Sequence, residues 1–251
     1  MLTPERHGKI LAMIEEKGIV NIQELVDATH SSESTIRRDL SQLHKEKKLK
    51  RVHGGAELLH QKGTEPNIAQ KADINLEEKQ KIGKFAAGLV KDGDRIFLDA
   101  GTTVLQMIRY LEGKDILVVT NGLTHIEELS QYQIPAYLIG GYVKQTTRAL
   151  IGARATSSLS EYRFDKCFMG VNGIHAESGY TTPDPEEAAV KTTAIRCSQT
   201  AYMLADRSKF DETAFAKIAD LHEAIVITNE LDEDLLEEYA EKTEIKVVST
   251  S

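Results

Sequence analysis

The chain has 251 residues and carries 39 acidic against 31 basic side chains, a formal net charge of −8. This length suits one large domain or two modest ones, and the average acidity taken alone argues against a polyanionic partner. No apolar run approaches the length of a membrane span and the N-terminus lacks a targeting pattern, so we expect a cytoplasmic protein with no membrane partner. Cys167 lies in an apolar run and is not close to Cys197 in sequence, which favours reduced thiols over a disulfide or a metal site.

Two short helices are the first elements that the sequence predicts. Pro4 suits the first turn of a helix over residues 3–17, and Gly18 suits the position just past its end. A second helix begins at Asn21, because Asn21 and Glu24 have the spacing of a capping box. The apolar positions expected in the core of these helices are Ile10, Met13, Ile14, Leu25 and Val26.

Residues 31–40 predict a third helix with one apolar face and one face of hydroxyl and guanidinium groups. Ile36, Leu40 and Leu43 recur at i, i+4 and i+7, so they form one stripe toward a core. Ser31 or Ser32 can cap the first turn. A helix of this kind can read DNA, because a guanidinium can fork onto guanine O6 and N7 in the major groove.

Residues 49–58 predict two short strands around a glycine tip, which completes a winged helix-turn-helix DNA-binding domain over residues 1–58. Residues 34–55 hold seven basic side chains against two acidic ones, a local charge of +5 that suits contact with phosphates. Asp39 is expected to orient neighbours within the domain, because a carboxylate repels phosphates. The candidate DNA-contacting residues are Ser32, Ser34, Thr35, Arg37, Arg38, Lys50, Arg51, His53 and Gly54.

The chain then turns polar and irregular over residues 59–75, which we interpret as a linker to a second domain over residues 76–251. Asn75 and Glu78 are expected to cap a helix with an apolar stripe of Ile82, Phe85, Ala86 and Leu89. Beyond it, strands and helices alternate, which predicts an open, parallel-rich α/β sheet with helices on both faces. The candidate strands span residues 96–99, 117–120, 136–139, 166–171, 201–205, 224–228 and 245–248.

Ligands of such sheets bind beyond the carboxyl ends of the strands, and polar residues gather there in this sequence. Residues 101–103 follow a strand and begin a predicted helix bearing Leu105, Ile108 and Leu111, so backbone N–H groups and two hydroxyls could cradle a phosphate. The candidate ligand-binding residues are Asp99, Gly101, Thr102, Thr103, Thr120, Asn121, Gly140, Gly141, Lys144, Arg148, Glu187, Lys191, Asp206 and Lys209.

The helix after Asp184 allows two interpretations. Asp184 is a good N-cap, Pro185 fits the first helical position, and Glu187 and Lys191 lie on one face at i, i+4. This spacing fits an exposed ion pair as well as it fits a ligand site. Asp206 and Lys209 also allow two interpretations, as part of a surface turn or as part of the rim of a pocket.

The chain resembles the DeoR family of bacterial repressors along essentially its full length. The DNA-binding signature is carried by Arg6, Ile10, Ile14, Ser32, Thr35, Ile36, Arg37, Arg38, Asp39 and Leu40, followed by the wing over residues 51–56. In the second domain the resemblance is carried by residues 99–103, 120–122, 140–141, 187–191 and 206–210. Within the family, the sequence looks most like the fructose operon repressors of Gram-positive bacteria.

The resemblance implies a sensor domain that shares its fold with ribose-5-phosphate isomerase and coenzyme A transferase-like enzymes. It places Glu187 and Lys191 at a sugar-phosphate pocket, and it implies fructose 1-phosphate as the effector, with tagatose 6-phosphate as an alternative. One DNA-binding domain covers few base pairs, so a homo-oligomer, dimer or tetramer, is expected on double-stranded operator DNA. No cofactor is expected.

The main rival hypothesis is a sugar-phosphate isomerase-like enzyme with an appended DNA-binding domain, in which Asp99, Glu187 and Lys191 move protons. A metabolic enzyme does not need a winged helix, so we expect no enzymatic activity. A nucleotide switch is disfavoured, because the sequence lacks G-x-x-x-x-G-K-[ST] and a G-x-G-x-x-G after a strand. A metal site is also disfavoured, because the eight histidines are scattered without ligand spacing.

Overall fold

The computed structural model describes residues 2–46, 48–52, 54–58 and 74–248. The chain divides into two compact units, residues 1–64 and 65–251, which we call the N-terminal and C-terminal units. Nearly all of the predicted linker lies outside the described residues. No helix in the described ranges is long and apolar enough to cross a membrane.

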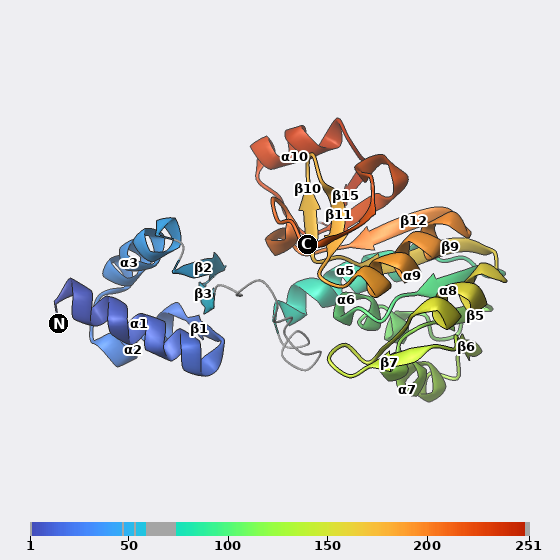
Figure 1. The fold of residues 1–251 in the computed structure, drawn as a ribbon, viewed down its shortest axis with the longest axis horizontal. Coiled ribbons are helices and arrows are strands. Elements are labelled where there is room, and N and C mark those ends of the chain that lie inside the picture. The colour runs from blue at the N-terminus through green and yellow to red at the C-terminus, as the bar shows by residue number, and fades with distance from the viewer. Residues whose placement is uncertain (1, 47, 53, 59–73, 249–251) are drawn as a thin grey trace. The chain divides into compact units, whose positions relative to one another are not determined.

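The N-terminal unit is a three-helix bundle with a three-stranded antiparallel sheet, in blue in Figure 1. Its apolar core comes from all three helices and includes the predicted Ile10, Ile14, Leu25, Ile36 and Leu40, each fully buried. The sheet order is β1-β3-β2, and β1 is a short strand that the sequence pattern did not reveal. The elements are α1 (Thr3–Lys17), β1 (Ile19–Asn21), α2 (Ile22–Thr29), α3 (Glu33–Lys45), β2 (Leu49–Val52) and β3 (Gly55–Leu58).

The helix ends predicted in the N-terminal unit are confirmed. Gly18 has φ 78° and donates its N–H to the Ile14 carbonyl, which closes α1. Asn21 and Glu24 form the reciprocal capping box of α2. Ser32 rather than Ser31 caps α3, because its hydroxyl accepts from the Thr35 N–H at 3.3 Å.

Asp39 acts within the domain as expected, because it ties α3 to α1. The Arg6 guanidinium donates two hydrogen bonds to its carboxylate, Nε–Oδ2 at 2.5 Å and Nη2–Oδ1 at 3.1 Å, and His7 Nε2 lies 3.2 Å from Oδ1. Burial alone would raise the pKa of Asp39, but the bonds from Arg6 and His7 outweigh it and hold the pKa below its usual value. The ion pair therefore stabilises the unit above about pH 4, and this stabilisation is lost as the pH falls through the lowered pKa.

We expect Asp39→Ala to destabilise the N-terminal unit by about 3 kcal/mol, because it leaves the Arg6 charge buried without its partner. All tyrosines and phenylalanines lie beyond residue 80 and the chain has no tryptophan, so tyrosine fluorescence reports on the C-terminal unit alone. Circular dichroism of the full chain should therefore show an earlier partial transition with no accompanying fluorescence change. Loss of both signals together at the wild-type temperature would contradict the prediction.

The C-terminal unit is built on a seven-stranded sheet in which every neighbouring pair of strands is parallel, as predicted. The central strands β9 and β4 are buried along most of their length, which explains their continuous apolar runs. In spatial order the strands are β15 (Ile245–Val247), β14 (Ile225–Thr228), β12 (Ser198–Leu204), β9 (Phe164–Gly170), β4 (Arg95–Leu98), β5 (Leu117–Thr120) and β6 (Ala136–Leu138).

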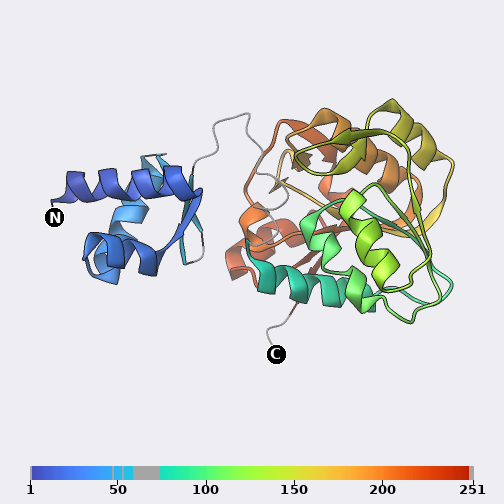
Figure 2. The same cartoon turned by 90° about the horizontal axis from the view of Figure 1, so that it is seen from below.

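Helices cover both faces of this sheet, as Figure 2 shows. Successive residues of β4 point to opposite faces: Phe97 joins one apolar cluster, and Ile96 and Leu98 join the other. The cluster around Ile96 is covered by α5 (Leu76–Gly88), α6 (Thr102–Leu105), η1 (Ile108–Tyr110) and α7 (Leu123–Gln131). The cluster around Phe97 is covered by α8 (Ala153–Ser160), α9 (Pro185–Arg196) and α10 (Glu233–Ala240).

Two smaller sheets were not predicted. One is the hairpin of β7 (Tyr142–Lys144) and β8 (Ala149–Ile151), and the other is an antiparallel sheet of β10 (Gly173–His175), β11 (Gly179–Thr182) and β13 (Ala216–Ala219). Two short 3₁₀ turns, η2 (Arg207–Lys209) and η3 (Leu221–Glu223), lie in the same part of the chain. The buried Tyr180 hydroxyl donates toward the carbonyls of Leu221 and Ala224 and holds η3 against β11.

Three local predictions are wrong. Asn75 does not cap α5 through its side chain; it adopts φ 54°, and its amide instead donates to Asp206 Oδ1 at 3.3 Å. Phe85 is 37% exposed, because the buried face of α5 is rotated toward Gly83, where the Gln106 backbone would lie only 2.8 Å from an added Cβ. The single helix expected after residue 101 is interrupted: α6 ends at Leu105 and a separate 3₁₀ turn follows.

Candidate functional site

The exposed face of α3 carries the side chains predicted to contact DNA. Ser34, Arg37 and Arg38 are exposed, while Ile36 and Leu40 face the core. Arg37 is held by Glu33 one turn earlier, with Nε–Oε1 at 2.9 Å and Nη2–Oε1 at 2.6 Å. Arg38 forms no ion pair with a described carboxylate. Its guanidinium is therefore the freer of the two for a new contact.

The wing is linked to this helix. Arg51 Nη1 donates to Ser41 Oγ on α3 at 2.8 Å, so Arg51 joins the wing to the recognition helix while remaining exposed. Gly54, at the tip, has φ 77° and no side chain, which suits a sharp turn. The Ser32 hydroxyl lies 2.8 Å from that of Thr35, so both contribute to the start of α3. His53 and the Lys50 side chain lie outside the described residues.

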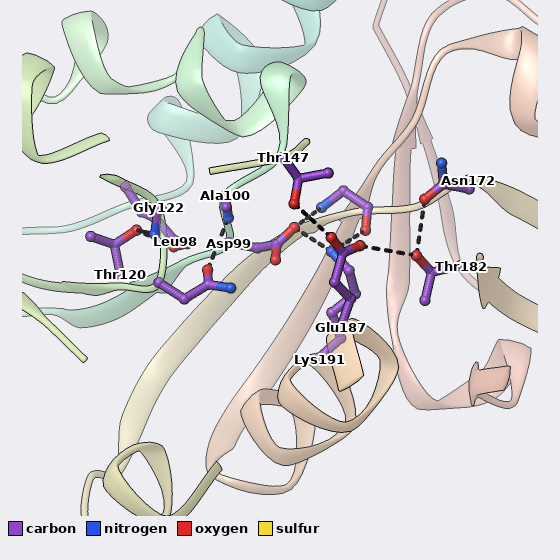
Figure 3. A network of polar contacts seen from close by, with 12 residues as sticks. Leu98, Asp99, Ala100, Thr120, Gly122, Thr147, Asn172, Thr182, Glu187 and Lys191 are labelled. Carbon is purple, nitrogen blue, oxygen red and sulfur yellow. Dashed lines mark hydrogen bonds and ion pairs between the residues drawn. The ribbon is translucent and has the colours of Figure 1, made fainter. Parts of the chain in front are cut away.

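In the C-terminal unit, a buried ion pair between Asp99 and Lys191 lies at the adjacent carboxyl ends of β4 and β9, as Figure 3 shows. Lys191, on α9, donates to Asp99 Oδ2 and to the Gly170 carbonyl at 3.0 Å. Asp99 Oδ2 also accepts the Gly170 N–H at 3.1 Å. Both residues are less than 10% exposed. A lysine and a carboxylate are thus held together at the point where ligands of parallel sheets bind.

A second cluster surrounds Glu187, one turn before Lys191 on α9 (Figure 3). Its Oε1 accepts from Lys144 Nζ at 3.0 Å and from Thr147 Oγ1 at 2.8 Å, both near the tip of the β7–β8 hairpin. Its Oε2 accepts from Thr182 Oγ1 at 3.4 Å. Lys144 Nζ also lies 3.0 Å from Asp184 Oδ2. The hairpin is therefore fastened to the first turn of α9 by charge-assisted hydrogen bonds.

These contacts contradict one of the two interpretations of α9. The exposed Glu187–Lys191 ion pair is wrong, because both side chains are buried and each is bonded elsewhere. Asp184 caps the helix as predicted, accepting from the N–H groups of Glu186 and Glu187. The sequence did not reveal Thr147, Thr182 or Asn172 as members of the cluster, since isolated hydroxyl and amide residues carry no periodic signal.

The turn after β5 serves mainly to hold the backbone. Asn121 Oδ1 accepts the Ala100 N–H at 2.9 Å, and its amide nitrogen lies 3.4 Å from the Leu150 carbonyl. Thr120 Oγ1 donates to the Leu98 carbonyl at 2.6 Å and accepts the Gly122 N–H at 3.0 Å. Both side chains therefore position the loops that begin at residues 100 and 122.

The predicted phosphate cradle lies beside the buried ion pair. Gly101 is the N-cap residue of α6, and a Cβ on it would lie 3.3 Å from the Gly170 Cα and 3.4 Å from Asp99 Oδ2. A side chain here would therefore lie in tight contact with the backbone at the end of β9. Thr102 is half-buried and Thr103 is buried. The structure therefore brings the cradle, Asp99 and Lys191 together.

Other predicted residues lie outside these contacts. Arg148 adopts φ 53° and its guanidinium lies 4.0 Å from Glu127, while Gly140 and Gly141 precede the β7–β8 hairpin. Asp206, two residues after β12, is buried and accepts from Ser208 and Asn75, so the surface-turn interpretation does not hold for it. Burial would raise the pKa of Asp206, but Lys209 and the Ser208 bonds outweigh it and lower the pKa.

His125 is a buried residue of this region that the sequence did not single out. It is fully buried on α7, and its Nδ1 lies 3.1 Å from Thr120 Oγ1. Burial lowers its pKa to about 4, so the ring is neutral near neutral pH. Among the residues that the structure describes, no cluster of three or more His, Cys, Asp or Glu could hold a metal ion.

The lowered pKa of His125 predicts a pH-dependent stability. The unfolded chain takes up a proton near pH 6.5 and the folded one only near pH 4, so stability should fall by about 3 kcal/mol between these values. Urea unfolding of the full chain, followed by tyrosine fluorescence, measures this slope. His125→Gln should flatten it, and an unchanged slope in that variant would assign the effect to other groups.

Comparison with known proteins assigns the family. Residues 6–62 match the DeoR-like helix-turn-helix domain, and residues 74–230 match the DeoR C terminal sensor domain. The chain belongs to the DeoR family. The winged helix and the parallel sheet described above are the two domains of this family, which confirms the predicted fold class.

Several transcriptional regulators are similar to the chain over nearly their full lengths. An uncharacterised helix-turn-helix-type transcriptional regulator of Bacillus subtilis, FruR, is 51% identical, with 99% of each chain covered. The transcriptional repressor GlcR of the same organism is 35% identical over 92% of this chain and 90% of its own length. The lactose phosphotransferase system repressor of Lactococcus lactis is 34% identical over 96% of each.

Solved structures are more distant. Ribose 5-phosphate isomerase A of Methanocaldococcus jannaschii is 22% identical over 54% of this chain and 55% of its own, with a TM-score of 0.41. The eIF2B delta subunit of Chaetomium thermophilum is 19% identical over 55% of this chain and 50% of its own, with a TM-score of 0.42. Likenesses at this level carry no information about function.

Proposed function

We propose that this DeoR-family protein represses a fructose-utilisation operon and is released from its operator by a phosphorylated sugar, fructose 1-phosphate. The observation that carries the proposal is the buried Asp99–Lys191 pair beside the Gly101 turn, at the carboxyl edge of the sensor sheet. An ammonium group, free backbone N–H groups and hydroxyls suit a phosphate, and carboxylates suit sugar hydroxyls. The name of the similar FruR protein supports fructose as the sugar.

On the DNA side, we propose that Arg38 and Arg37 read bases in the major groove and that Ser34 and Thr35 contact phosphates or thymine methyl groups. The exposure of Ser34, Arg37 and Arg38 on one face of α3 supports this assignment. Arg51 and Gly54, on the wing, would contact the neighbouring DNA backbone. Lys50 and His53 are proposed to do the same, on the basis of the sequence alone.

On the effector side, we propose that the phosphate binds over residues 101–103, with Lys191 and Lys144 supplying positive charge. Asp99 and Glu187 would accept hydrogen bonds from sugar hydroxyls. Both lysines are already paired with carboxylates, so the phosphate must compete for them. Asn121 and Thr120 act by positioning the two loops, since their polar atoms are bonded to the backbone. Thr103, Gly140, Gly141, Arg148, Asp206 and Lys209 are proposed to lie around the pocket on the basis of the sequence.

Release from DNA requires that the effector favour an arrangement of the oligomer that binds the operator poorly. We propose a homodimer or homotetramer that presents at least two DNA-binding domains. Such coupling is reciprocal, so operator DNA should weaken sugar-phosphate binding by the same factor. No catalytic role is proposed for Asp99, Glu187 or Lys191, and incubation with pentose and hexose phosphates should yield no product.

The test is a thermal-shift panel of sugar phosphates on the full-length protein. A ligand that binds only the native state raises the melting temperature, and fructose 1-phosphate should do so at the lowest concentration. A larger shift with tagatose 6-phosphate would keep the sensor function and change the sugar. No shift with any phosphorylated sugar would overturn the proposed sensor function.

A further inference from the structure

Three arginines converge at the amino edge of the parallel sheet, the edge opposite the Asp99–Lys191 pair. Arg95 is the first residue of β4, Arg163 directly precedes β9, and Arg196 ends α9 just before β12. These three strands are adjacent in the sheet, in the order β12-β9-β4. Together the arginines line a hollow of about 380 Å³. No local sequence pattern connects them, because neighbouring members of the set are 68 and 33 positions apart in the chain.

The charge of this hollow is not neutralised by the residues that the structure describes. All three arginines are exposed, and none of them forms an ion pair with a carboxylate in the described part of the chain. The one carboxylate in the lining is Asp165, which leaves two net positive charges. Three guanidiniums that line one hollow repel one another, so the arrangement favours binding of an anion.

The one acidic residue has a structural task. Asp165 Oδ2 accepts the Arg95 backbone N–H at 2.8 Å, and Oδ1 accepts from Gln199 Nε2 at 3.4 Å. Its carboxylate thus ties the starts of β4 and β12 to β9 and does not reach out to a guanidinium. Arg163 is oriented by the chain, because its Nη1 donates to the carbonyls of Ser160 and Tyr162 at 3.0 and 2.6 Å. One arginine of the hollow is therefore pre-positioned.

We propose that this arginine hollow, lined by Arg95, Arg163 and Arg196, is a second ligand site for a compact polyanion with two phosphate groups, a diphosphate or a bisphosphorylated metabolite. Guanidinium groups bind phosphate oxygens through paired hydrogen bonds, so three of them can engage more oxygens than a single phosphate group presents. The volume lies in the range of small-molecule sites. The site is separate from the proposed sugar-phosphate pocket and does not depend on it.

The test uses inorganic pyrophosphate and isothermal titration calorimetry of the full-length protein. The double variant Arg95→Gln/Arg196→Gln removes two charges whose side chains are exposed and make no described hydrogen bond or ion pair, so it should fold like the wild type. We expect its dissociation constant for pyrophosphate to be higher than that of the wild type by about tenfold or more. Arg154→Gln, an exposed arginine on α8 outside the hollow, is the matched control and should bind as the wild type does.

Two results would overturn the proposal. One is an absence of pyrophosphate binding to the wild type, and the other is equal binding by the double variant, which would place the anion on another basic surface. The response of the same variant to fructose 1-phosphate is measured in parallel and should not change. Failure of the arginine hollow is therefore distinguishable from failure of the proposed sensor function.

Discussion

Arg38→Ala should weaken operator binding by about 100-fold or more in an electrophoretic mobility-shift titration of the full-length protein. A bidentate arginine–guanine contact contributes about 1–3 kcal/mol, and a dimer loses it at two half-sites. Arg38 is exposed and unpaired with any described carboxylate, so its replacement should leave the fold intact. An affinity within about twofold of the wild type would remove Arg38 from the proposed DNA contacts.

Two changes in the neighbouring ion pair serve as internal controls. Glu33→Gln removes a carboxylate from the surface of α3 and releases Arg37, whose guanidinium it holds at 2.6 Å. Operator binding should therefore become tighter, by about two- to tenfold, since a charge near the phosphates is lost. Arg37→Ala should weaken binding less than Arg38→Ala does. Weaker binding by Glu33→Gln would show that the carboxylate itself supports the complex.

Lys191→Met should abolish the response to the effector and also destabilise the sensor domain, by about 3–5 kcal/mol. The change leaves the Asp99 carboxylate buried beside the Gly170 N–H without its cation. Thermal unfolding followed by tyrosine fluorescence measures this loss. Because a destabilised protein can lose function for trivial reasons, this variant alone does not separate a ligand contact from a structural role.

The double variant Asp99→Asn/Lys191→Met makes that separation. Removing both charges should restore most of the stability, while the concentration of fructose 1-phosphate needed for release rises by about 100-fold, since two charge-assisted contacts are lost. Asp94→Asn/Lys166→Met removes a comparable ion pair, 2.6 Å apart, at the opposite edge of the sheet. That control should retain a normal response. A normal response in the Asp99 and Lys191 double variant would refute the proposed pocket.

The sequence predicted those parts of the fold that depend on local patterns. Gly18, the Asn21–Glu24 pair and the Asp184–Pro185 start each satisfy a helix end through neighbours in the chain, and all three are confirmed. The parallel sheet was predictable because alternating apolar strands and helices leave few other topologies. Phe85 was wrongly predicted to be buried. The rotation of α5 is set by a backbone contact at Gly83, and the spacing of apolar residues along the helix does not reveal such a contact.

The site was predictable only in part, for a similar reason. Asp99 became a candidate because it follows a strand, whereas Glu187 and Lys191 share a helix face and became candidates through the family resemblance. Their actual partners lie elsewhere in sequence: Lys191 bonds Asp99 across 92 positions, and Glu187 bonds Lys144 across 43. The i, i+4 spacing suggested an exposed pair that does not exist. The β7–β8 hairpin, which supplies Lys144 and Thr147, is three residues per strand and left no clear pattern.

The most direct test of the account is a titration of the full-length protein against the promoter DNA of its own operon, with and without fructose 1-phosphate. We expect tight binding at low ionic strength, a marked loss of affinity when the sugar phosphate is present, and an equal loss of sugar-phosphate affinity when the DNA is present. Operator affinity that stays the same while calorimetry shows the sugar phosphate to be bound would contradict the central claim.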